Sequence, residues 1–458
     1  MAVIAPFKGL TYNFHQRNDL SPLMAPPYDV ISPEEQEAYY HSDPHNVIRL
    51  ILGKKKTGDS DWDNRYTRAA DYFQRWQSDG TLIRAKEPCL YLTALTYDPG
   101  NGDPIRVRWG LIALVRIEEA DSDIVLPHER TFSAHKDDRL KLFRACNAQF
   151  SQVFGLYEDS ENRALNACRE TADSTPHMNF EFKDGTRHQL WILKDPRLFK
   201  TVSTVMQDKT IFIADGHHRY ETSRNYRNIM RARYGRRPAN RAYEFVMMYL
   251  SNLSDEGLTI LPSHRLVTRV EGFQVNRFLK SVSQWFHIKT FHAECRDLAR
   301  ECKEMKQRLK DAGKEDAAIA FRLHGSDQWY LFCLKPGMRE QLGRDLHPSL
   351  RELDVLVLSR LILQKSLGFT KEDLDDEEIF HYESSIRKAV SQVESGEYQL
   401  AFLLNPTRMA HVKEVAGNSL VMPRKSTYFY PKVLSGLVFN KIDPHEYIQV
   451  PGNPPARP

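Results

Sequence analysis

Short runs of β-branched and aromatic residues alternate with helical patterns through most of this sequence, and no other feature constrains the fold as strongly. Such runs begin at Cys89, Arg106, His188, Thr210 and Tyr243, and most are too rich in apolar residues for strands of an exposed sheet. This alternation favours a mixed α/β fold over a helical bundle or a β-sandwich. We therefore expect buried strands that are covered by helices.

Two helices can be placed from the signals at their ends. One is expected to begin at Pro33, because Ser32 and Glu35 form a capping box around a proline at the first helical position. The other is expected between Asp61 and Gly80, where apolar residues recur at helical spacing and the glycine provides a stop. The apolar stripe of this second helix is expected to face the core.

The 458 residues are enough for two or three domains of ordinary size. A weak boundary lies near Val267 to Phe273, after which a new alternation of strands and helices begins. We therefore expect a core domain over residues 1–268 and a smaller α/β region over residues 269–458. In that region the sequence predicts a hairpin from AAIAFRLHG and WYLFCLKPG, a helix at DVLVLSRLILQKSLG and a strand at EYQLAFLLNP.

The composition excludes several classes of protein. Hydrophobic residues make up 41% and charged residues 27% of the chain, which is near the globular average and argues against disorder. No apolar run is long enough to span a membrane, and the start lacks the pattern of a signal peptide, so we expect a cytoplasmic protein. The six cysteines include no CxxC pair, which argues against a zinc ribbon or a disulfide scaffold. We expect them to be reduced and mostly buried.

The charge of the chain is nearly balanced. The 64 basic and 60 acidic residues give a formal charge of +4, which does not by itself indicate nucleic-acid binding. The stretch from Arg224 to Arg241 concentrates arginines in one expected helix and its exit. A solvated helix face is the preferred interpretation of this stretch, and a surface for an anionic ligand is the alternative.

The stretch TIFIADGHHRYETS, from Thr210 to Ser223, is the strongest candidate for a functional site. Its apolar start is typical of a buried strand, Asp215 and Gly216 are typical of a turn, and the residues from His217 onward are typical of a helix start. The N–H groups and the positive dipole at such a start attract anions. Gly216 would let a phosphate approach the main chain closely.

The polar residues of this stretch suit a nucleotide phosphate. Arg219 can hold phosphate oxygens in bidentate geometry, and His217 and His218 can donate hydrogen bonds. Asp215 could retain Mg²⁺ beside the phosphates. In the alternative, purely structural interpretation, Asp215 caps the helix, one histidine is buried, and Arg219 pairs with Glu221 or another acid. Zinc or iron at the two histidines is a lesser alternative, because no companion HxxxH or CxxC is present.

A carboxylate that accepts the proton of a hydroxyl substrate would complete a phosphotransferase site. Asp29, in APPYDVIS, is one candidate because the helix that follows already has Ser32 as its cap, and a turn-stabilising role is the alternative. His128 and Glu129, which precede Arg130 in LPHERTF, form a second candidate group of base, acid and cation behind the strand-like DIVL.

Further basic residues could bind a polyphosphate or a substrate carboxylate. Lys136 and Arg139 lie near an expected helix start, where ordinary exposed helix charges are the alternative. His264 and Arg265 lie at the entrance of an expected strand. Lys425 is followed by Ser-Thr, but the stretch is not a P-loop because the required glycines are absent.

Six separated motifs, in order, resemble those of the domain of unknown function 1015 family nearly from end to end. The motifs are LMAPPYDVIS, HNVIRL, LPHERTFSAHKDDRLKLFRA, IADGHHRYET, LPSHRLV and MPRKSTYFYPKVLSGLVF. This resemblance indicates a family and implies no particular activity.

The strand followed by DGHHR also resembles the phosphate-binding box of the ParB and sulfiredoxin superfamily, whose members include nucleotide-binding partition proteins, sulfiredoxins and free-serine kinases. In sulfiredoxins the box reads Gly-Cys-His-Arg, and His217 takes the place of the attacking cysteine here, which argues against sulfinic acid reduction. Partition proteins have a box like Gly-Glu-Arg-Arg and a following helix-turn-helix, which has no clear equivalent in this sequence. The kinase branch is nearest, and the resemblance implies a ParB/sulfiredoxin-like core over residues 1–268.

We therefore expect a nucleotide-dependent phosphotransferase that acts on a small hydroxyl compound, with free L-serine as the favoured acceptor. ATP or ADP and Mg²⁺ are the expected cofactors, and Asp29, His128 and Glu129 are the candidate catalytic residues. We expect no nucleic-acid or membrane partner. The sequence leaves open whether the chain forms a homo-oligomer. One alternative is a non-catalytic ParB-like nucleotide-binding protein that regulates or touches nucleic acid, and another is hydrolysis or nucleotidyl transfer at the same phosphate site.

Overall fold

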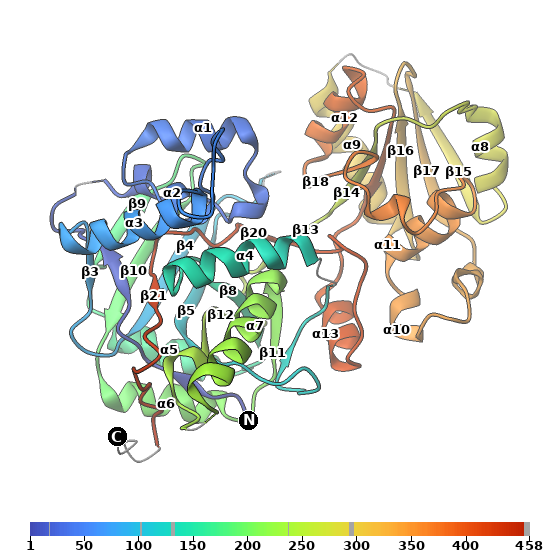
Figure 1. Ribbon diagram of the computed structural model, residues 1–458. Coiled ribbons are helices and arrows are strands. Elements are labelled where there is room, and N and C mark those ends of the chain that lie inside the picture. The colour runs from blue at the N-terminus through green and yellow to red at the C-terminus, as the bar shows by residue number, and fades with distance from the viewer. Residues whose placement is uncertain (18, 101–102, 130–132, 237, 293–296, 453–458) are drawn as a thin grey trace. The chain divides into compact units, whose positions relative to one another are not determined.

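The computed structural model describes residues 1–17, 19–100, 103–129, 133–236, 238–292 and 297–452. The chain folds into two compact units of mixed α/β structure (Figure 1). Unit 1 contains Met1–Pro127, Thr131–Thr259 and Pro431–Pro458, and unit 2 contains His128–Arg130 and Ile260–Tyr430. The chain therefore passes into unit 2 near Thr259 and returns to unit 1 near Pro431, whereas the sequence pattern indicates a single division after residue 268.

Unit 1 is built on a nine-stranded sheet with the order β6-β11-β8-β12-β5-β4-β10-β9, and β1 pairs with β5. Most pairs are antiparallel, but β11 is parallel to β6, and β12 is parallel to β8. The five strands expected in this part of the sequence are confirmed as β4, β5, β10, β11 and β12. The strands are Ile4–Ala5 (β1), Leu90–Tyr97 (β4), Arg106–Arg116 (β5), Val125–Leu126 (β6), Val153–Tyr157 (β8), Met178–Glu181 (β9), Arg187–Leu193 (β10), Ile211–Asp215 (β11) and Phe245–Asn252 (β12).

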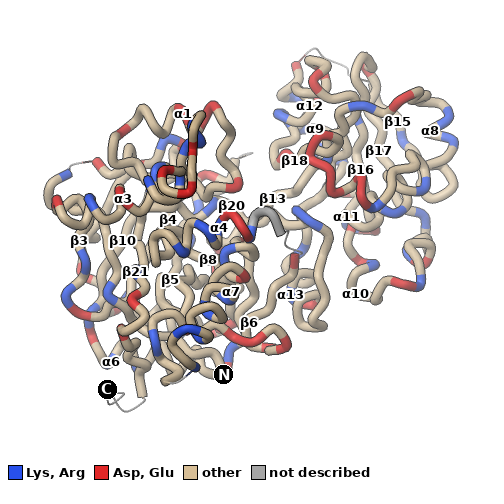
Figure 2. The backbone as a smooth tube through the Cα atoms, viewed as in Figure 1, with Lys and Arg blue, Asp and Glu red and all other residues tan. Residues whose placement is uncertain are grey.

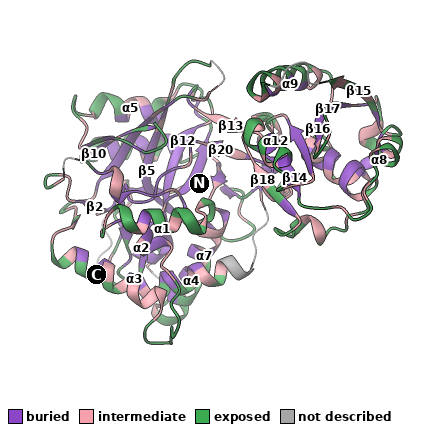
Figure 3. Ribbon diagram, turned by 90° about the horizontal axis from the view of Figure 1, so that it is seen from above, coloured by how far each residue is buried: buried purple, intermediate pink, exposed green. Residues whose placement is uncertain are grey.

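Two short antiparallel pairs complete the strands of unit 1: Leu10–Tyr12 (β2) with Leu82–Arg84 (β3), and Ala148–Gln149 (β7) with Asn440–Lys441 (β21). The central strands are buried on both faces; all residues of β12, for example, are buried (Figure 3). This burial explains why these strands read as continuous apolar runs in the sequence. On one face, side chains of α5, α6 and α7 pack onto the sheet in a single apolar core.

The helices of unit 1 include the two that the sequence predicts. The Ser32 and Glu35 capping box is present at the start of α1, with backbone to side-chain distances of 3.2 and 3.0 Å. The second predicted helix is α3, which buries Ala69, Phe73 and Trp76. The helices are Pro33–Ser42 (α1), Ile48–Ile51 (α2), Arg65–Ser78 (α3), Ser133–Cys146 (α4), Arg163–Thr171 (α5), Pro196–Met206 (α6) and His217–Tyr234 (α7), with 3₁₀ turns at Ser21–Leu23, Tyr28–Val30 and Ala242–Glu244.

Unit 2 contains a six-stranded antiparallel sheet with the order β15-β17-β16-β19-β14-β18. The predicted hairpin is confirmed as β16 and β17, and the predicted strand as β19. The strands are His264–Val267 (β14), Phe286–His292 (β15), Ala318–Leu323 (β16), Gln328–Leu334 (β17), Phe380–Glu383 (β18) and Leu400–Leu404 (β19), and Thr259–Leu261 (β13) pairs with Tyr428–Tyr430 (β20).

Helices cover the sheet of unit 2. The predicted helix at DVLVLSRLILQKSLG begins as α11 but continues as a π-helix over Leu358–Gln364. The α-helices are Val275–Val282 (α8), Leu298–Ala312 (α9), Pro348–Arg351 (α10), Asp354–Val357 (α11), Ile386–Glu394 (α12) and Met409–Gly417 (α13), with 3₁₀ turns at Met338–Leu342 and Asp373–Asp375.

Charge and cysteine placement agree with the composition. Basic and acidic residues are interspersed along both units (Figure 2). Of the cysteines in the described ranges, four are buried and Cys333 is half-buried, and all five are free thiols; Cys295 lies outside the described residues. Among the helices that the structure describes, none has both the length and the apolar character needed to cross a membrane.

Candidate functional site

The segment from Ile211 to Tyr234 folds as the strand, turn and helix that the sequence predicts. β11 ends at Asp215, Gly216 is the N-cap residue, and α7 begins at His217. Gly216 has a φ of 89°, in the left-handed region that glycine adopts without strain. The first turn of α7 contains no acidic residue, so no carboxylate of that turn offsets the positive end of the helix dipole.

Asp215 is the centre of a buried ion-pair network. Its carboxylate accepts hydrogen bonds from the guanidinium of Arg219 and the ammonium of Lys432, and Arg219 also donates to the backbone carbonyl of Gln152. The side chains of Asp215, Arg219 and Lys432 are 12%, 11% and 14% exposed. Burial alone would raise the pKa of Asp215, but Lys432 and Arg219 hold it well below its usual range. The ionised carboxylate therefore fixes two cations beside the start of α7.

The network confirms one detail of the structural interpretation of this motif and corrects another. Arg219 does pair with an acid, but that acid is Asp215, whereas Glu221 pairs with Lys136 at 3.0 Å. Asp215 does not cap the helix, because Gly216 occupies the N-cap position. Asp215 therefore holds two cations beside the helix start, and such an arrangement suits an anion.

Tyr28 and Arg139 reach the same region from other parts of unit 1. The ring centroid of Tyr28 lies 4.0 Å from Cζ of Arg139, and both side chains line a cavity together with Arg219. Burial and the neighbouring Asp29 raise the pKa of Tyr28 to about 12, although Arg139 and Arg219 act in the opposite direction. Asp29 itself is exposed. The structure thus brings Arg139 and Tyr28, the residue before Asp29, to the cavity that Arg219 also lines.

The cavity beside Arg219 is small and partly polar. Its volume is about 60 Å³, so it can hold a small chemical group but not a nucleoside, since pockets for small-molecule ligands have volumes of roughly 300–1,000 Å³. Gln149, Ser151 and Ser223 contribute polar groups to its lining. Arg139 is fixed at its edge by the backbone carbonyl of Ile51 at 2.5 Å and by a carboxylate, that of Asp138.

Four of the predicted site residues lie in unit 2, where three of them form a second cluster. Nε2 of His128 lies 3.0 Å from the hydroxyl of Thr427, and that hydroxyl donates to Glu129 at 3.5 Å. Arg265 is buried, and Glu129 is one of the groups whose charge acts on its guanidinium. Arg130, the third member of the expected acid, base and cation group, lies outside the described residues.

His264 and Arg265 begin β14 and have partners within unit 2. Nδ1 of His264 accepts a hydrogen bond from the N–H of Leu404 at 3.1 Å, and burial lowers the pKa of His264 to about 3, so the imidazole is neutral at pH 7. The guanidinium of Arg265 donates to the carbonyls of Ser263 at 2.6 Å and Lys425 at 3.2 Å. Their expected contact with a nucleotide stays a prediction.

The arginine-rich helix face has a structural use that neither sequence interpretation includes. Arg227 is fully buried and donates to the carbonyl of Ile117 at 2.6 Å and to Glu119 at 2.9 Å. Arg231 pairs with Glu119 at 2.7 Å and with Glu244 at 2.6 Å. These two arginines therefore fasten α7 to the rest of unit 1 and do not provide an open surface for an anion.

Sequence reasoning missed Lys432, Gln152 and Tyr28. Lys432 lies 217 positions after Asp215, so no local spacing could connect them, although Lys432 belongs to one of the six family motifs. Gln152 contributes only its backbone carbonyl, which any residue type could supply. Tyr28 stands directly before Asp29, and this adjacency was the one signal that could have indicated it.

The side chains around Asp215 show whether this site could hold the expected Mg²⁺. Within the parts of the chain that the structure describes, no group of three or more His, Cys, Asp or Glu side chains is arranged to hold a metal ion. Asp215 offers one carboxylate, and both of its oxygens already accept from cations. Mg²⁺ commonly takes one or two protein carboxylates together with substrate phosphates and water, so Asp215 fits an ion that arrives with a nucleotide.

Replacing Gly216 tests the geometry of the helix start. Gly216→Ala is expected to destabilise the protein by about 1–2 kcal/mol, because an L-residue is strained in the left-handed conformation. The added Cβ would also lie 2.8 Å from the guanidinium of Arg219, so we expect Arg219 to shift and nucleotide affinity to fall. Urea unfolding and calorimetric titration with ATP measure the two effects.

The matched control is Gly235→Ala at the other end of α7. Gly235 has a φ of 88°, and a Cβ there would meet nothing within 4 Å, so this variant also places an L-residue at a positive φ but does not displace Arg219. It is expected to lose stability but keep its nucleotide affinity. Equal losses of affinity in the two variants would show that Arg219 is not the affected group.

Comparisons with known proteins give a family and several distant structural similarities. The family described as "Protein of unknown function (DUF1015)" matches residues 4–356. No curated protein sequence matches the chain.

Three solved structures illustrate the structural similarity. A conserved hypothetical protein from Pyrococcus furiosus is 12% identical with a TM-score of 0.33, and the match covers 70% of this chain and 92% of that protein. A mutant free serine kinase in complex with ADP is 10% identical with a TM-score of 0.33, over 72% of this chain and 91% of the kinase. C-terminally truncated SbnI from Staphylococcus aureus is 10% identical with a TM-score of 0.33, over 71% of this chain and 85% of SbnI.

Proposed function

We propose that this chain, which belongs to the DUF1015 family of proteins of unknown function, is a nucleotide-dependent phosphotransferase that acts on a small hydroxyl compound. The observation that carries the proposal is the network in which Asp215 holds Arg219 and Lys432 beside Gly216. A helix N-terminus with a glycine at its cap and two oriented cations is well suited to phosphate oxygens.

In this proposal the phosphates of ATP or ADP lie against the start of α7. Arg219 and Lys432 contact phosphate oxygens, and His217 and His218 donate further hydrogen bonds. Asp215 would be the residue that holds Mg²⁺, and the ion would neutralise charge on the phosphates. Lys136 and Arg139 are the next basic groups of unit 1 that a polyphosphate could reach. In unit 2, His264 and Arg265 remain proposed nucleotide-binding residues.

The transfer step needs a base for the acceptor. The hydroxyl oxygen attacks the terminal phosphorus, the bond from that phosphorus to the bridging oxygen of the nucleotide breaks, and the hydroxyl proton passes to a carboxylate. Asp29 is the candidate in unit 1, because it is exposed and adjoins Tyr28 at the cavity beside Arg219. Glu129, with His128, is the candidate in unit 2.

Free L-serine is the favoured acceptor because of the resemblance of DGHHR to the box of free-serine kinases. The test is to incubate purified protein with Mg²⁺ and ATP or ADP, with and without L-serine and a panel of small alcohols, and to follow products by phosphorus NMR. Phosphoserine that forms only with both substrates would support the kinase. Binding of nucleotide without turnover of any acceptor would favour a nucleotide-responsive regulatory protein instead, and absence of binding would remove the phosphate site.

Two carboxylate variants distinguish the candidate bases. If Asp29 is the base, Asp29→Asn is expected to lower kcat by roughly 100- to 10,000-fold, because general base catalysis contributes about that factor. Nucleotide affinity should change little, since Asp29 does not belong to the Asp215 network. Glu129→Gln measures the same quantities for unit 2, and whichever variant keeps the wild-type kcat is not the base.

A further inference from the structure

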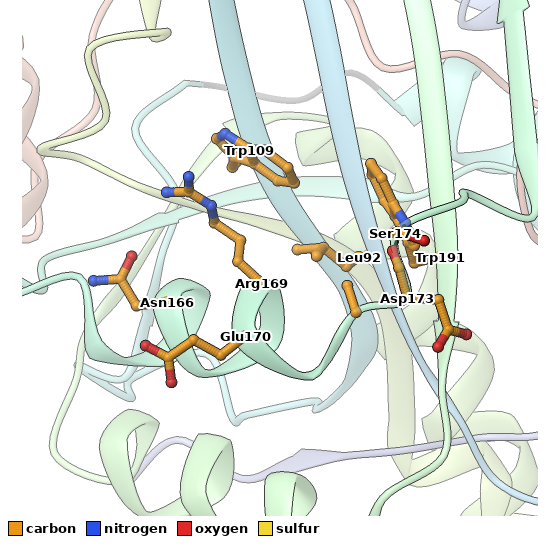
Figure 4. Close-up of a pocket in the computed structure, with 9 residues that line it drawn as sticks. Leu92, Trp109, Asn166, Arg169, Glu170, Asp173, Ser174 and Trp191 are labelled. Carbon is orange, nitrogen blue, oxygen red and sulfur yellow. Dashed lines mark hydrogen bonds between the residues drawn. The ribbon is translucent and has the colours of Figure 1, made fainter.

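A second pocket lies in unit 1, where α5 faces β4, β5 and β10 (Figure 4). Its volume is about 500 Å³, within the range of roughly 300–1,000 Å³ that is typical of sites for small molecules. Leu92, Trp109 and Trp191 come from the three strands, and Arg169 and Glu170 come from α5. Figure 4 shows Arg169 extending from α5 toward Trp109, and Leu92 lies on β4, the strand between those of the two tryptophans.

The two tryptophans form one aromatic surface. Their ring centroids are 5.8 Å apart with an interplanar angle of 28°, and this spacing leaves no room for a third ring between them. Trp191 is fixed because its indole N–H donates to the carbonyl of Asp173 at 2.9 Å. Trp109 is only half-buried, so part of its ring faces the pocket.

The ring of Trp109 is in contact with a cationic side chain of the same unit, Arg169. Cζ of Arg169 lies 4.7 Å from its ring centroid, within the distance at which a guanidinium is attracted to the face of an indole. Arg169 is exposed and lies near the C-terminal end of α5. A long, exposed side chain can leave the ring by rotating into solvent, which would open the face of Trp109 to another cation.

The charges around the pocket select against anions. Its charged lining residues are Arg169, Glu170 and Asp173, which together carry one positive and two negative charges. When Arg169 turns away, the two carboxylates dominate the mouth. A nucleotide or another phosphorylated ligand would be repelled there, whereas a cation would be attracted by both the carboxylates and the ring.

The pocket is separate from the start of α7. Asp215 pairs with Phe154, Phe154 with Tyr249, and Tyr249 with Ile112 on β5. Trp109 lies three residues from Ile112 on that strand, or about 10 Å along it, and β5 is three strands from β11, or about 14 Å across the sheet. A ligand in this pocket therefore does not touch the phosphate site.

We propose that this pocket binds a small organic cation with a flat or methylated head, such as a guanidinium or a quaternary ammonium group, and that Arg169 occupies the face of Trp109 until the ligand replaces it. Leu92 and Trp191 provide the apolar floor, and Glu170 and Asp173 hold the positive charge. This binding site does not depend on the proposed phosphotransferase activity, and a test without nucleotide measures it alone.

The test is titration of the full chain with choline and with agmatine, followed by tryptophan fluorescence and calorimetry. Trp109→Leu is expected to weaken binding by about 10- to 30-fold, because a desolvated cation–π contact contributes roughly that factor. Arg169→Gln is expected to strengthen binding, because it removes the competing guanidinium. The neutral analogue 3,3-dimethylbutan-1-ol, in which carbon replaces the quaternary nitrogen of choline, should bind at least about tenfold more weakly than choline, since it has no cation–π attraction.

Arg169→Gln keeps the test decisive even if Trp109→Leu unfolds, because Arg169 is exposed. The matched control is Arg163→Gln on the same helix, whose side chain is 55% exposed and does not line the pocket; it should bind as the wild type does. Weaker binding in Arg169→Gln would overturn the proposal, because it would make Arg169 a contact of the ligand. Equal affinity for choline and dimethylbutanol, or binding of neutral sugars or nucleosides in place of the cations, would also overturn it.

Discussion

Arg219→Ala is expected to weaken the binding of ATP or ADP by roughly 10- to 100-fold, because hydrogen bonds to charged groups contribute about 1.5–3 kcal/mol. In the proposed complex the guanidinium of Arg219 is the strongest donor to the phosphates at the start of α7. The loss should appear in calorimetric titrations with Mg²⁺ present. The fold should survive, because Asp215 keeps its ion pair with Lys432.

Arg233→Ala is the control for this experiment. Arg233 belongs to the same helix but lies near its C-terminal end, where its guanidinium is 5.3 Å from the ring of Tyr234. It removes the same charge from α7 far from Gly216 and is expected to leave nucleotide affinity unchanged. If Arg219→Ala binds nucleotide as tightly as the wild type, Arg219 has no part in the phosphate site.

Asp215→Asn is expected to lower the free energy of unfolding of unit 1 by about 3 kcal/mol or more, because removing one partner of a buried ion pair leaves uncompensated charge behind. Here the substitution removes the carboxylate that Arg219 and Lys432, both nearly buried, share as an ion-pair partner. Urea unfolding followed by circular dichroism should show an earlier midpoint. Added phosphate should restore more stability to this variant than to the wild type, since an anion can replace the lost charge.

Asp208→Asn is the matched control, because the side chain of Asp208 is 77% exposed and lies 3.9 Å from its partner Lys209. Removing so exposed a pair should change stability by less than about 1 kcal/mol. If Asp215→Asn and Asp208→Asn have the same free energy of unfolding, the Asp215 network does not stabilise unit 1.

The pH dependence of stability has a definite sign. Lys432 and Arg219 depress the pKa of Asp215 in the folded state, whereas an unfolded aspartate has a pKa of about 3.9. The stabilisation is therefore present in full well above pH ~4 and is lost as the pH falls below that value, because the unfolded chain takes up the proton more readily. The wild type should lose more stability than Asp215→Asn in this acid range.

The secondary structure around Gly216 could be predicted because its signals are local. TIFIAD is an apolar run of strand length, and Gly216 ends it at the position where only glycine adopts the backbone conformation easily. The capping box at Ser32 and the hairpin of β16 and β17 depend on neighbouring residues in the same way. The π-helix after Val357 was not predicted, because its apolar pattern differs little from that of an α-helix.

The division of the chain into two units was harder to predict from the sequence than the secondary structure. The last residues, from Pro431 onward, return to unit 1 and supply both Lys432 and β21. A return of this kind depends on packing over hundreds of residues, and it leaves no local mark in the sequence. The sequence pattern could show that the strand and helix alternation restarts, but not where the chain crosses back.

The sequence by itself determined the mixed α/β class, five strands of the large sheet of unit 1, and the strand, turn and helix that present His217, His218 and Arg219, because periodicity and glycine placement act over a few residues. Only the tertiary structure decided which charges meet. It paired Asp215 with Lys432 from the end of the chain, assigned Glu221 to Lys136, and buried Arg227 within unit 1. The physical reason is that an ion pair depends on distance in space, and in a sheet with this strand order neighbours in space are distant in sequence.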